Sequence, residues 1–432
     1  MKLRSKYDRE ILLLALPALG ALASEPLYVL VDTAIVGHLG TSQLASLAIA
    51  ATVLSTAFTI FNFLTYGTTA QVARLHGAGR NEDAAHLGSQ ALWLALGIGA
   101  VLLVILELGA PSIVTLMGGE GEVKDGAVLY LRISALGAPL FILASAAQGF
   151  LRGMGDLRTP LLILVAAHAV NATLEVLFVY GFGWGLAGSA WGTVIAQFGM
   201  AAAFFAVQYR AGLERPHPGK MRPLMRIGSE IAVRTTALTG SFLIGSAVLA
   251  RIGAASLGAH QIAFQLWVFL ALILDAIAIA GQVMVGRMLG ASDPDGARAA
   301  ATRMIGWSVL IGAAFGVVLM GLGSVVPDLF TNDPAVVAKA REIWWIFALT
   351  MPFNGAVFAL DGILIGAGDT RFLMWGMLAA AAVYIPIVLL TLHNGWGIVG
   401  VWCGLAALIA VRLVTCGGRF LGSHWALTGA PA

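Results

Sequence analysis

Five acidic side chains lie deep inside long apolar stretches of the sequence, where an ionised group is costly. They are Glu25, Asp32, Glu175, Asp275 and Asp361. A carboxylate at the centre of a bilayer costs about 2.5–3.5 kcal/mol even on lenient insertion scales, so intramembrane acids usually mark ion or substrate pathways. These residues are therefore the first candidates for chemistry in this chain.

Two of these acids share one face of the first apolar stretch. Glu25 and Asp32 are seven residues apart, which on an α-helix places them on the same side, about 10 Å apart along the axis. Tyr28 lies between them on that face. The spacing predicts a polar wall on the first helix.

A second polar stripe runs along the stretch that contains Glu175. His168, Asn171 and Glu175 follow at positions i, i+3 and i+7, so they share one helix face. Desolvation and like-charge proximity favour the neutral form of a carboxyl group, so such a cluster could bind a proton, or a cation once it is deprotonated. We predict a proton- or cation-binding site and a substrate cavity beside it. The site comprises Asp32, Glu25, Glu175 and Asn171, and the cavity candidates are Tyr28 and His168, although a buried histidine more often only satisfies a hydrogen bond.

A third group of polar residues lies in the second half of the chain. Arg234, Asp275 and Asp361 should lie at similar depth, about 10–15 Å from the same ends of their helices. Equal depth favours a pair between Arg234 and a carboxylate. A structural ion pair and a role in gating or ion binding both remain open for this second-lobe polar cluster.

The elements that carry these residues are hydrophobic helices. The chain of 432 residues is 59% hydrophobic and 11% charged, against about 25% charged in soluble domains. Apolar runs long enough to cross a bilayer follow one another with short polar breaks. They predict an all-α polytopic membrane protein with twelve transmembrane helices. Their approximate ranges are 10–36, 43–71, 87–110, 124–151, 158–182, 187–209, 227–250, 256–285, 304–326, 337–365, 372–392 and 397–419.

Positive charge is concentrated on alternate breaks between these helices. Lys2, Arg4 and the segment 210–226 belong to the basic set, which predicts that both termini are cytoplasmic. The first run is too long for a cleaved signal peptide, so we predict a multi-pass protein of the cytoplasmic membrane. The basic residues then reflect topology, and no nucleic-acid partner is expected.

An internal duplication divides the chain into halves. At an offset of 213 residues, Gly153 to Arg158 returns as Gly366 to Arg371, and Pro139 and Gly149 return as Pro352 and Gly362. Six helices per half predict parallel repeats, in two lobes around a central cavity, as in secondary transporters. We predict lobes at 1–209 and 227–432. In the linker at 210–226, Pro216, Pro218 and Pro223 argue against a continuous helix.

The duplication does not extend to the acidic residues. Asn62 and Gln148 occupy the repeat positions of Asp275 and Asp361, and Gly245 occupies that of Asp32. The two lobes therefore share a scaffold but differ in their chemistry. No zinc-binding histidine pair, C-x-x-C or phosphate loop accompanies the acids, so neither an enzyme nor a metal or organic cofactor is expected.

Several segments together resemble MATE (multidrug and toxic compound extrusion) transporters, most closely their DinF-like branch. They are Glu25-Pro26-Leu27, Val31 to Gly40, Met117-Gly118, Tyr130 to Ile133, Asn171 with Glu175, Gly188 to Thr193, and Leu360-Asp361-Gly362. The resemblance implies two six-helix lobes and extrusion driven by proton or sodium entry. It also implies that Asp32 is the ion site, since it matches the family's first-helix aspartate.

The sequence departs from the family pattern at two places. Glu175 replaces the usual aspartate of the fifth helix, and the region Ala237 to Gly240 lacks the acid of the sodium-driven branch. We therefore expect a monomeric antiporter that exports amphipathic, cationic or neutral organic compounds in exchange for protons. Sodium coupling, a flippase for lipid-linked saccharides and a channel or receptor-like scaffold are the alternatives.

Overall fold

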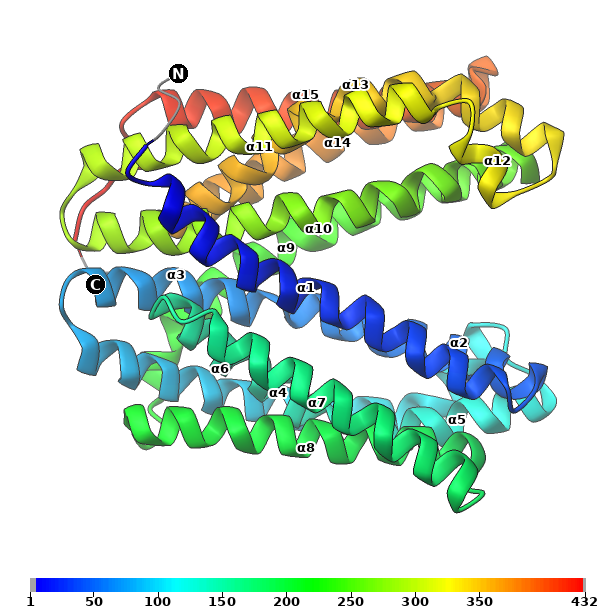
Figure 1. The fold of residues 1–432 in the computed structure, drawn as a ribbon, viewed down its shortest axis with the longest axis horizontal. Helices are drawn as coiled ribbons and strands as arrows, with labels where there is room; N and C mark the ends of the chain where they lie inside the picture. The colour runs from blue at the N-terminus through cyan, green and yellow to red at the C-terminus, as the bar shows by residue number, and fades with distance from the viewer. Residues whose placement is uncertain (1–4, 430–432) are drawn as a thin grey trace. The chain divides into compact units, whose positions relative to one another are not determined.

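The computed structural model describes residues 5–429, so Lys2 and Arg4 lie outside the described residues. Within that range the regular structure is helical (Figure 1). The helices of the first half are α1 (Asp8–Gly37), α2 (Thr41–Phe61), α3 (Phe63–Gly77), α4 (Asn81–Leu116), α5 (Gly121–Ala135), α6 (Ala138–Gly153), α7 (Arg158–Val176), the π-helical turn η1 (Leu177–Gly181) and α8 (Gly185–Ala211). Those of the second half are α9 (Pro218–Ile252), α10 (Ala254–Gly290), α11 (Pro294–Leu322), α12 (Val326–Phe330), α13 (Pro334–Gly366), α14 (Thr370–Asn394) and α15 (Gly397–Leu421).

The described helices confirm the polytopic membrane architecture. Eleven of them, counting α2 with α3, are long and apolar enough to cross a membrane, and a twelfth results if the bent pair α5 and α6 forms one span. The members of that pair meet at 48°. Twelve predicted spans therefore correspond to eleven helical spans and one broken span.

The chain folds into two compact units. The N-terminal unit comprises Gly20–Gly228, and the C-terminal unit comprises the chain from Ser229 onward together with the start of α1, up to Leu19. The sequence predicts instead that the whole first helix belongs to the first lobe. The difference has a local cause, because Asp8 accepts hydrogen bonds from Arg303 Nε (2.6 Å) and Trp307 Nε1 (2.9 Å), and Glu10 pairs with Arg287.

The two halves share their close helix contacts. A Cβ added at Gly149 would lie 2.7 Å from the carbonyl oxygen of Thr65, and one added at Gly362 would lie 2.1 Å from that of Ala278. Thr65 and Ala278 are themselves related by the offset of 213 residues. Glycine at both positions therefore allows α6 to approach α3, and α13 to approach α10, backbone to backbone. The repeat seen in the sequence is a repeat of helix packing.

Two breaks distinguish the N-terminal half from its repeat. Asn62 separates α2 from α3, whereas the corresponding α10 continues through Asp275. Gly137 lies between α5 and α6, whereas the corresponding α13 continues through Thr350. A Cβ at Gly137 would lie 1.8 Å from Gln197 Oε1 on α8, so a side chain at this position would require Gln197 to move.

The connection between the halves is held against α4. Trp93 Nε1 donates to the carbonyl oxygen of Glu214 (2.8 Å), and Gln90 Nε2 donates to that of Arg215 (2.9 Å). A hydrogen bond from Lys220 Nζ (2.6 Å) holds the pKa of the Glu214 carboxyl below its usual value. Our expectation that Pro223 interrupts the helix is wrong, because α9 begins at Pro218 and runs through Pro223.

Candidate functional site: a polar cavity in the N-terminal unit

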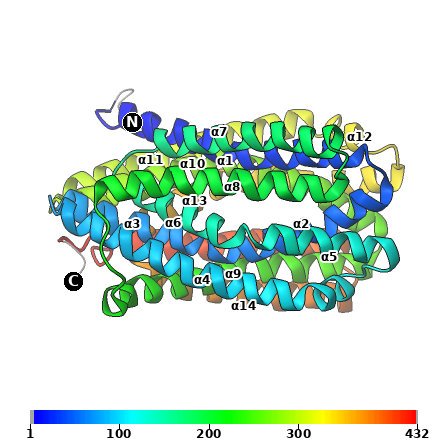
Figure 2. The ribbon, with the colours of Figure 1, turned by 90° about the horizontal axis from the view of Figure 1, so that it is seen from below.

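A cavity of about 470 Å³ lies within the N-terminal unit. Residues of α1, α2, α3, α5, α6, α7 and α8 line it, and Figure 2 shows these helices from a second direction. The lining includes five of the residues singled out from the sequence, which are Glu25, Tyr28, Asp32, His168 and Asn171. Residues of both predicted polar stripes therefore face one cavity, whereas Glu175 is fully buried and does not line it.

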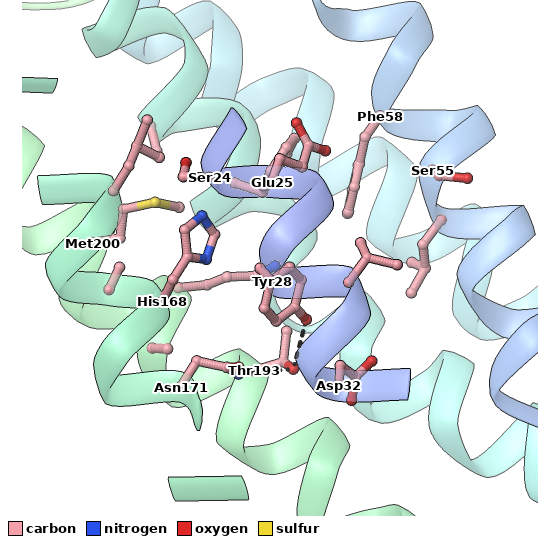
Figure 3. A pocket seen from close by; sticks show the side chains of 18 of the residues that line it. Ser24, Glu25, Tyr28, Asp32, Ser55, Phe58, His168, Asn171, Thr193 and Met200 are labelled. Carbon is pink, nitrogen blue, oxygen red and sulfur yellow. Dashed lines mark hydrogen bonds between the residues drawn. The ribbon is translucent and has the colours of Figure 1, made fainter. Parts of the chain in front are cut away.

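Thr193 of α8 connects the two stripes. Its hydroxyl accepts a hydrogen bond from Asn171 Nδ2 (3.1 Å) and lies 3.4 Å from Glu175 Oε1, to which it donates. It also lies 3.2 Å from the hydroxyl of Tyr28 (Figure 3). One hydroxyl thus joins α1 and α7, so a change at any of these residues alters the hydrogen bonds of the others.

Asp32 lies at the buried end of this network. Ser189 Oγ donates a hydrogen bond of 2.6 Å to Asp32 Oδ1, and the residue is only 6% exposed. The Asp32 carboxyl interacts with the carboxyl of Glu175, which is fully buried, and with the hydroxyl of Tyr130. Two buried carboxyl groups that lie close together favour a state in which they share a proton.

Close packing between α7 and α8 places Glu175. A Cβ on Gly192 would lie 3.1 Å from Glu175 Cγ, and one on Gly188 would lie 2.8 Å from the backbone of Phe178. The α-helix of α7 ends one residue after Glu175 and continues as the π-helical turn η1. Turns of this kind widen the helix locally and often occur at functional sites.

Aromatic rings form two walls of the cavity. Tyr28 and His168 stack with ring centroids 5.0 Å apart, and Phe58 stacks on Phe141 with centroids 4.2 Å apart. Glu25 is exposed on the cavity side of α1, on the Phe58 side in Figure 3, and Asp32 lies two turns further along that helix. The cavity therefore presents one accessible carboxylate near aromatic faces and one buried carboxyl pair.

A separate charged cluster lies inside the C-terminal unit. Asp361 on α13 forms salt bridges with Arg234 on α9 and Arg412 on α15, and these three side chains are 9%, 14% and 7% exposed. The sequence indicated a pair between Arg234 and an acid at equal depth, and the structure places Asp361 in that position. Asp275 is half-buried on α10 in the same unit.

Sequence reasoning did not identify several residues of these sites. Ser189, Thr193 and Tyr130 contact the predicted acids, and Arg412 is the second partner of Asp361. The hydroxyl groups gave a weak signal, since Ser and Thr are common in membrane helices. Arg412 carried a stronger one, because a cation inside a span requires a partner.

Long apolar helices around a polar cavity are the architecture of a multi-pass membrane protein with room for a small molecule. The MatE family profile matches residues 17–177 and 231–390, once in each half. The chain belongs to this family, as its resemblance to MATE transporters predicted. It is an efflux transporter for small molecules.

Relatives of this chain occur in plants and bacteria. The probable multidrug resistance protein NorM of Xanthomonas campestris is 30% identical and matches 97% of this chain and 95% of its own length. DNA damage-inducible protein F of Escherichia coli is 29% identical, and the match covers 95% of this chain and 92% of that protein. Protein DETOXIFICATION 44, chloroplastic, of Arabidopsis thaliana is 30% identical, and the match covers 95% of this chain and 81% of that protein.

Solved MATE structures share the fold. A structure of a mutant of the Vibrio cholerae MATE transporter VcmN superposes with a TM-score of 0.88 at 20% identity, over 96% of each chain. A MATE structure in the bent conformation superposes with a TM-score of 0.87 at 20% identity, over 96% of this chain and 94% of the other.

Proposed function

We propose that this transporter exports amphipathic organic compounds, cationic or neutral, in exchange for protons that enter at Asp32 and Glu175. The observation that supports this proposal is the buried carboxyl pair at the side of the cavity. Two adjacent carboxyl groups readily hold one proton, and Thr193 and Tyr28 connect the pair to the cavity wall. Because the ion site and the substrate site share one hydrogen-bonded network, binding at one site can change the affinity of the other.

The coupling follows from competition within this network. A protonated pair carries less negative charge, so the cavity attracts a cationic solute less strongly and releases it. Loss of the proton restores the charge and the hydrogen bonds that Thr193 and Ser189 donate to the carboxylates. Each ligand thereby weakens the binding of the other, which is the thermodynamic requirement for exchange.

The cavity suits a solute of drug-like size. A volume of about 470 Å³ is within the range of about 300–1,000 Å³ typical of small-molecule sites. The stacked rings of Tyr28 and His168 and of Phe58 and Phe141 offer apolar faces, and Glu25 offers an accessible negative charge. A neutral amphipathic solute uses the same faces without the charge.

Sodium coupling is the second candidate. Asn171 Oδ1 and Glu175 Oε2 are buried oxygens without a hydrogen-bond donor among the described residues, and hard cations take oxygen ligands. A lipid-linked saccharide flippase is less well supported. Its cavity should offer several cations to a pyrophosphate group, whereas Arg152 is the one lysine or arginine among the described residues that line this cavity.

The experiment that tests the proposal separates the two coupling ions. Purified protein is reconstituted into liposomes, and uptake of a fluorescent organic cation is followed under an imposed pH gradient or an imposed sodium gradient, with the membrane potential clamped. We expect the pH gradient alone to drive accumulation. Collapse of that gradient by nigericin should stop it within the same trace.

The remaining outcomes decide between the alternatives. Accumulation under the sodium gradient alone would replace proton coupling by sodium coupling. Failure of both gradients across a panel of cationic and neutral compounds would contradict the exporter and favour a flippase or a channel. Protein-free liposomes are the control for passive permeation of the fluorescent solute.

A further inference from the structure

A second, much smaller cavity lies inside the C-terminal unit. Its volume is about 20 Å³, and residues of α9, α10, α13 and α15 line it. Most of its wall is apolar or aromatic. The polar side chains in the wall are those of Thr350, Asn354, Trp402 and Arg412.

Two of the four polar side chains in this wall carry a hydrogen-bond donor without an acceptor among the described residues. Trp402 Nε1 and Asn354 Nδ2 have no hydrogen-bond partner among the described residues, although Trp402 is only 3% exposed and Asn354 only 1%. The Arg412 guanidinium has five N–H groups, and within residues 5–429 the acceptor recorded for it is Asp361. Thr350 donates its hydroxyl proton to the carbonyl oxygen of Phe347.

Unsatisfied donors in such a place need an explanation. Buried polar groups in folded proteins are nearly always hydrogen-bonded, and each exception lowers stability. Asp361 does not supply the missing acceptor, because it is not part of the cavity wall. Two other charged residues of this unit, Arg234 and Asp275, do not line the cavity either. A bound species in the cavity could supply the missing acceptor.

We propose that this cavity binds a small monovalent anion, either a halide ion or the carboxylate group of a small acid. Such a ligand only accepts hydrogen bonds, so it complements Arg412, Trp402 and Asn354 together. A water molecule also needs about 10–15 Å³, but it must donate two hydrogen bonds of its own in a wall that is poor in free acceptors.

Aromatic rings form part of the same wall. Phe242 meets Phe264 and Trp267 edge to face, at interplanar angles of 71° and 75°. The edge of an aromatic ring carries partial positive charge, whereas its face is negative. An anion beside these rings would therefore lie at their edges rather than over their faces. The ligand would act as a fixed counter-ion for the C-terminal unit, independently of which solute the transporter exports.

The first test locates the ion directly. Anomalous diffraction is recorded at the bromine absorption edge from crystals of the full-length protein grown in sodium bromide. In a separate measurement, the melting temperature of the protein in detergent is followed at constant ionic strength. The buffers contain chloride, bromide or formate, with the bulky sulfonate HEPES as reference. We expect an anomalous peak beside Arg412 and a saturable rise in melting temperature. Stabilisation by formate as well as bromide assigns a carboxylate ligand, and stabilisation by halides only assigns a halide ion.

Two variants separate the site from the fold. Trp402→Phe keeps the ring but removes one donor, so the half-saturating bromide concentration should rise roughly tenfold. Asn354→Asp places a carboxylate beside Arg412 at nearly constant shape. This variant should lose the anion dependence and melt in HEPES buffer at least as high as the parent protein.

The control is Trp345→Phe, because Trp345 is 51% exposed and does not line the cavity. It should respond to bromide as the parent does. The proposal fails if bromide peaks appear elsewhere only, if melting temperature does not depend on the anion, or if Trp402→Phe and Trp345→Phe respond to bromide alike.

Discussion

Replacing Asp32 by asparagine is expected to abolish transport driven by a pH gradient, down to the rate seen with protein-free liposomes. Asparagine has nearly the shape of aspartic acid and still accepts the hydrogen bond from Ser189, so the cavity should keep its form. The amide cannot take up or release a proton near neutral pH. Glu175 would then lack the neighbouring carboxyl group with which, on the proposed mechanism, it shares the transported proton.

The measurement is the liposome assay with a fluorescent cation, together with equilibrium binding of that cation in detergent. Asp83→Asn is the matched control, because it makes the same chemical change on the exposed start of α4. It should transport as the parent does. Ser189→Ala keeps both carboxyl groups and should reduce the rate only partly. Undiminished proton-driven transport by Asp32→Asn would overturn the site assignment, even if the protein remained an exporter.

Replacing Gly362 by alanine is expected to destabilise the C-terminal unit by about 3 kcal/mol or more, the upper range for overpacking. The new Cβ would lie 2.1 Å from the carbonyl oxygen of Ala278 and 2.6 Å from its carbonyl carbon. Both atoms belong to helix backbone, so α10 and α13 must separate to admit it. At an ordinary helix position the same change stabilises by about 0.5–1 kcal/mol.

Unfolding of the purified protein in mixed micelles of increasing SDS content measures this effect. Gly321→Ala on α11 is the matched control, since a Cβ there meets no atom within 4 Å, and its stability should not fall. Gly149→Ala changes the repeat counterpart of Gly362. The stability of this variant should lie between those of the other two, because its Cβ would lie 2.7 Å from the carbonyl oxygen of Thr65. Equal stability of the Gly362 and Gly321 variants would show that the close approach of α13 to α10 is not maintained.

Much of the fold and part of the site could be predicted from the sequence. The length of a hydrophobic segment predicts a membrane span, because a membrane helix forms all of its backbone hydrogen bonds within itself, whatever its neighbours are. Helical spacing placed Glu25, Tyr28 and Asp32 on one face, and all three line the cavity. The repeated glycines Gly149 and Gly362 indicated close contacts in both halves, which the structure contains.

The errors and omissions arose where one helix meets another. The bend between α5 and α6 lies next to Gln197, which comes from a different helix. The division of α1 between two units depends on Asp8 and its partner Arg303, nearly 300 residues later. No local pattern contains such pairs.

The sequence by itself determined the membrane class, the doubled scaffold and the set of acids that the apolar spans must accommodate. These properties follow from the hydrophobicity of each segment and from the spacing of its residues, and both can be read from that segment without its neighbours. Only the tertiary structure decided which helix faces meet. It brought Thr193 and Ser189 to the acids, paired Arg412 with Asp361, and left donors of Trp402 and Asn354 without acceptors among the described residues. Helix rotation and packing set those contacts, because they depend on residues far apart in the chain.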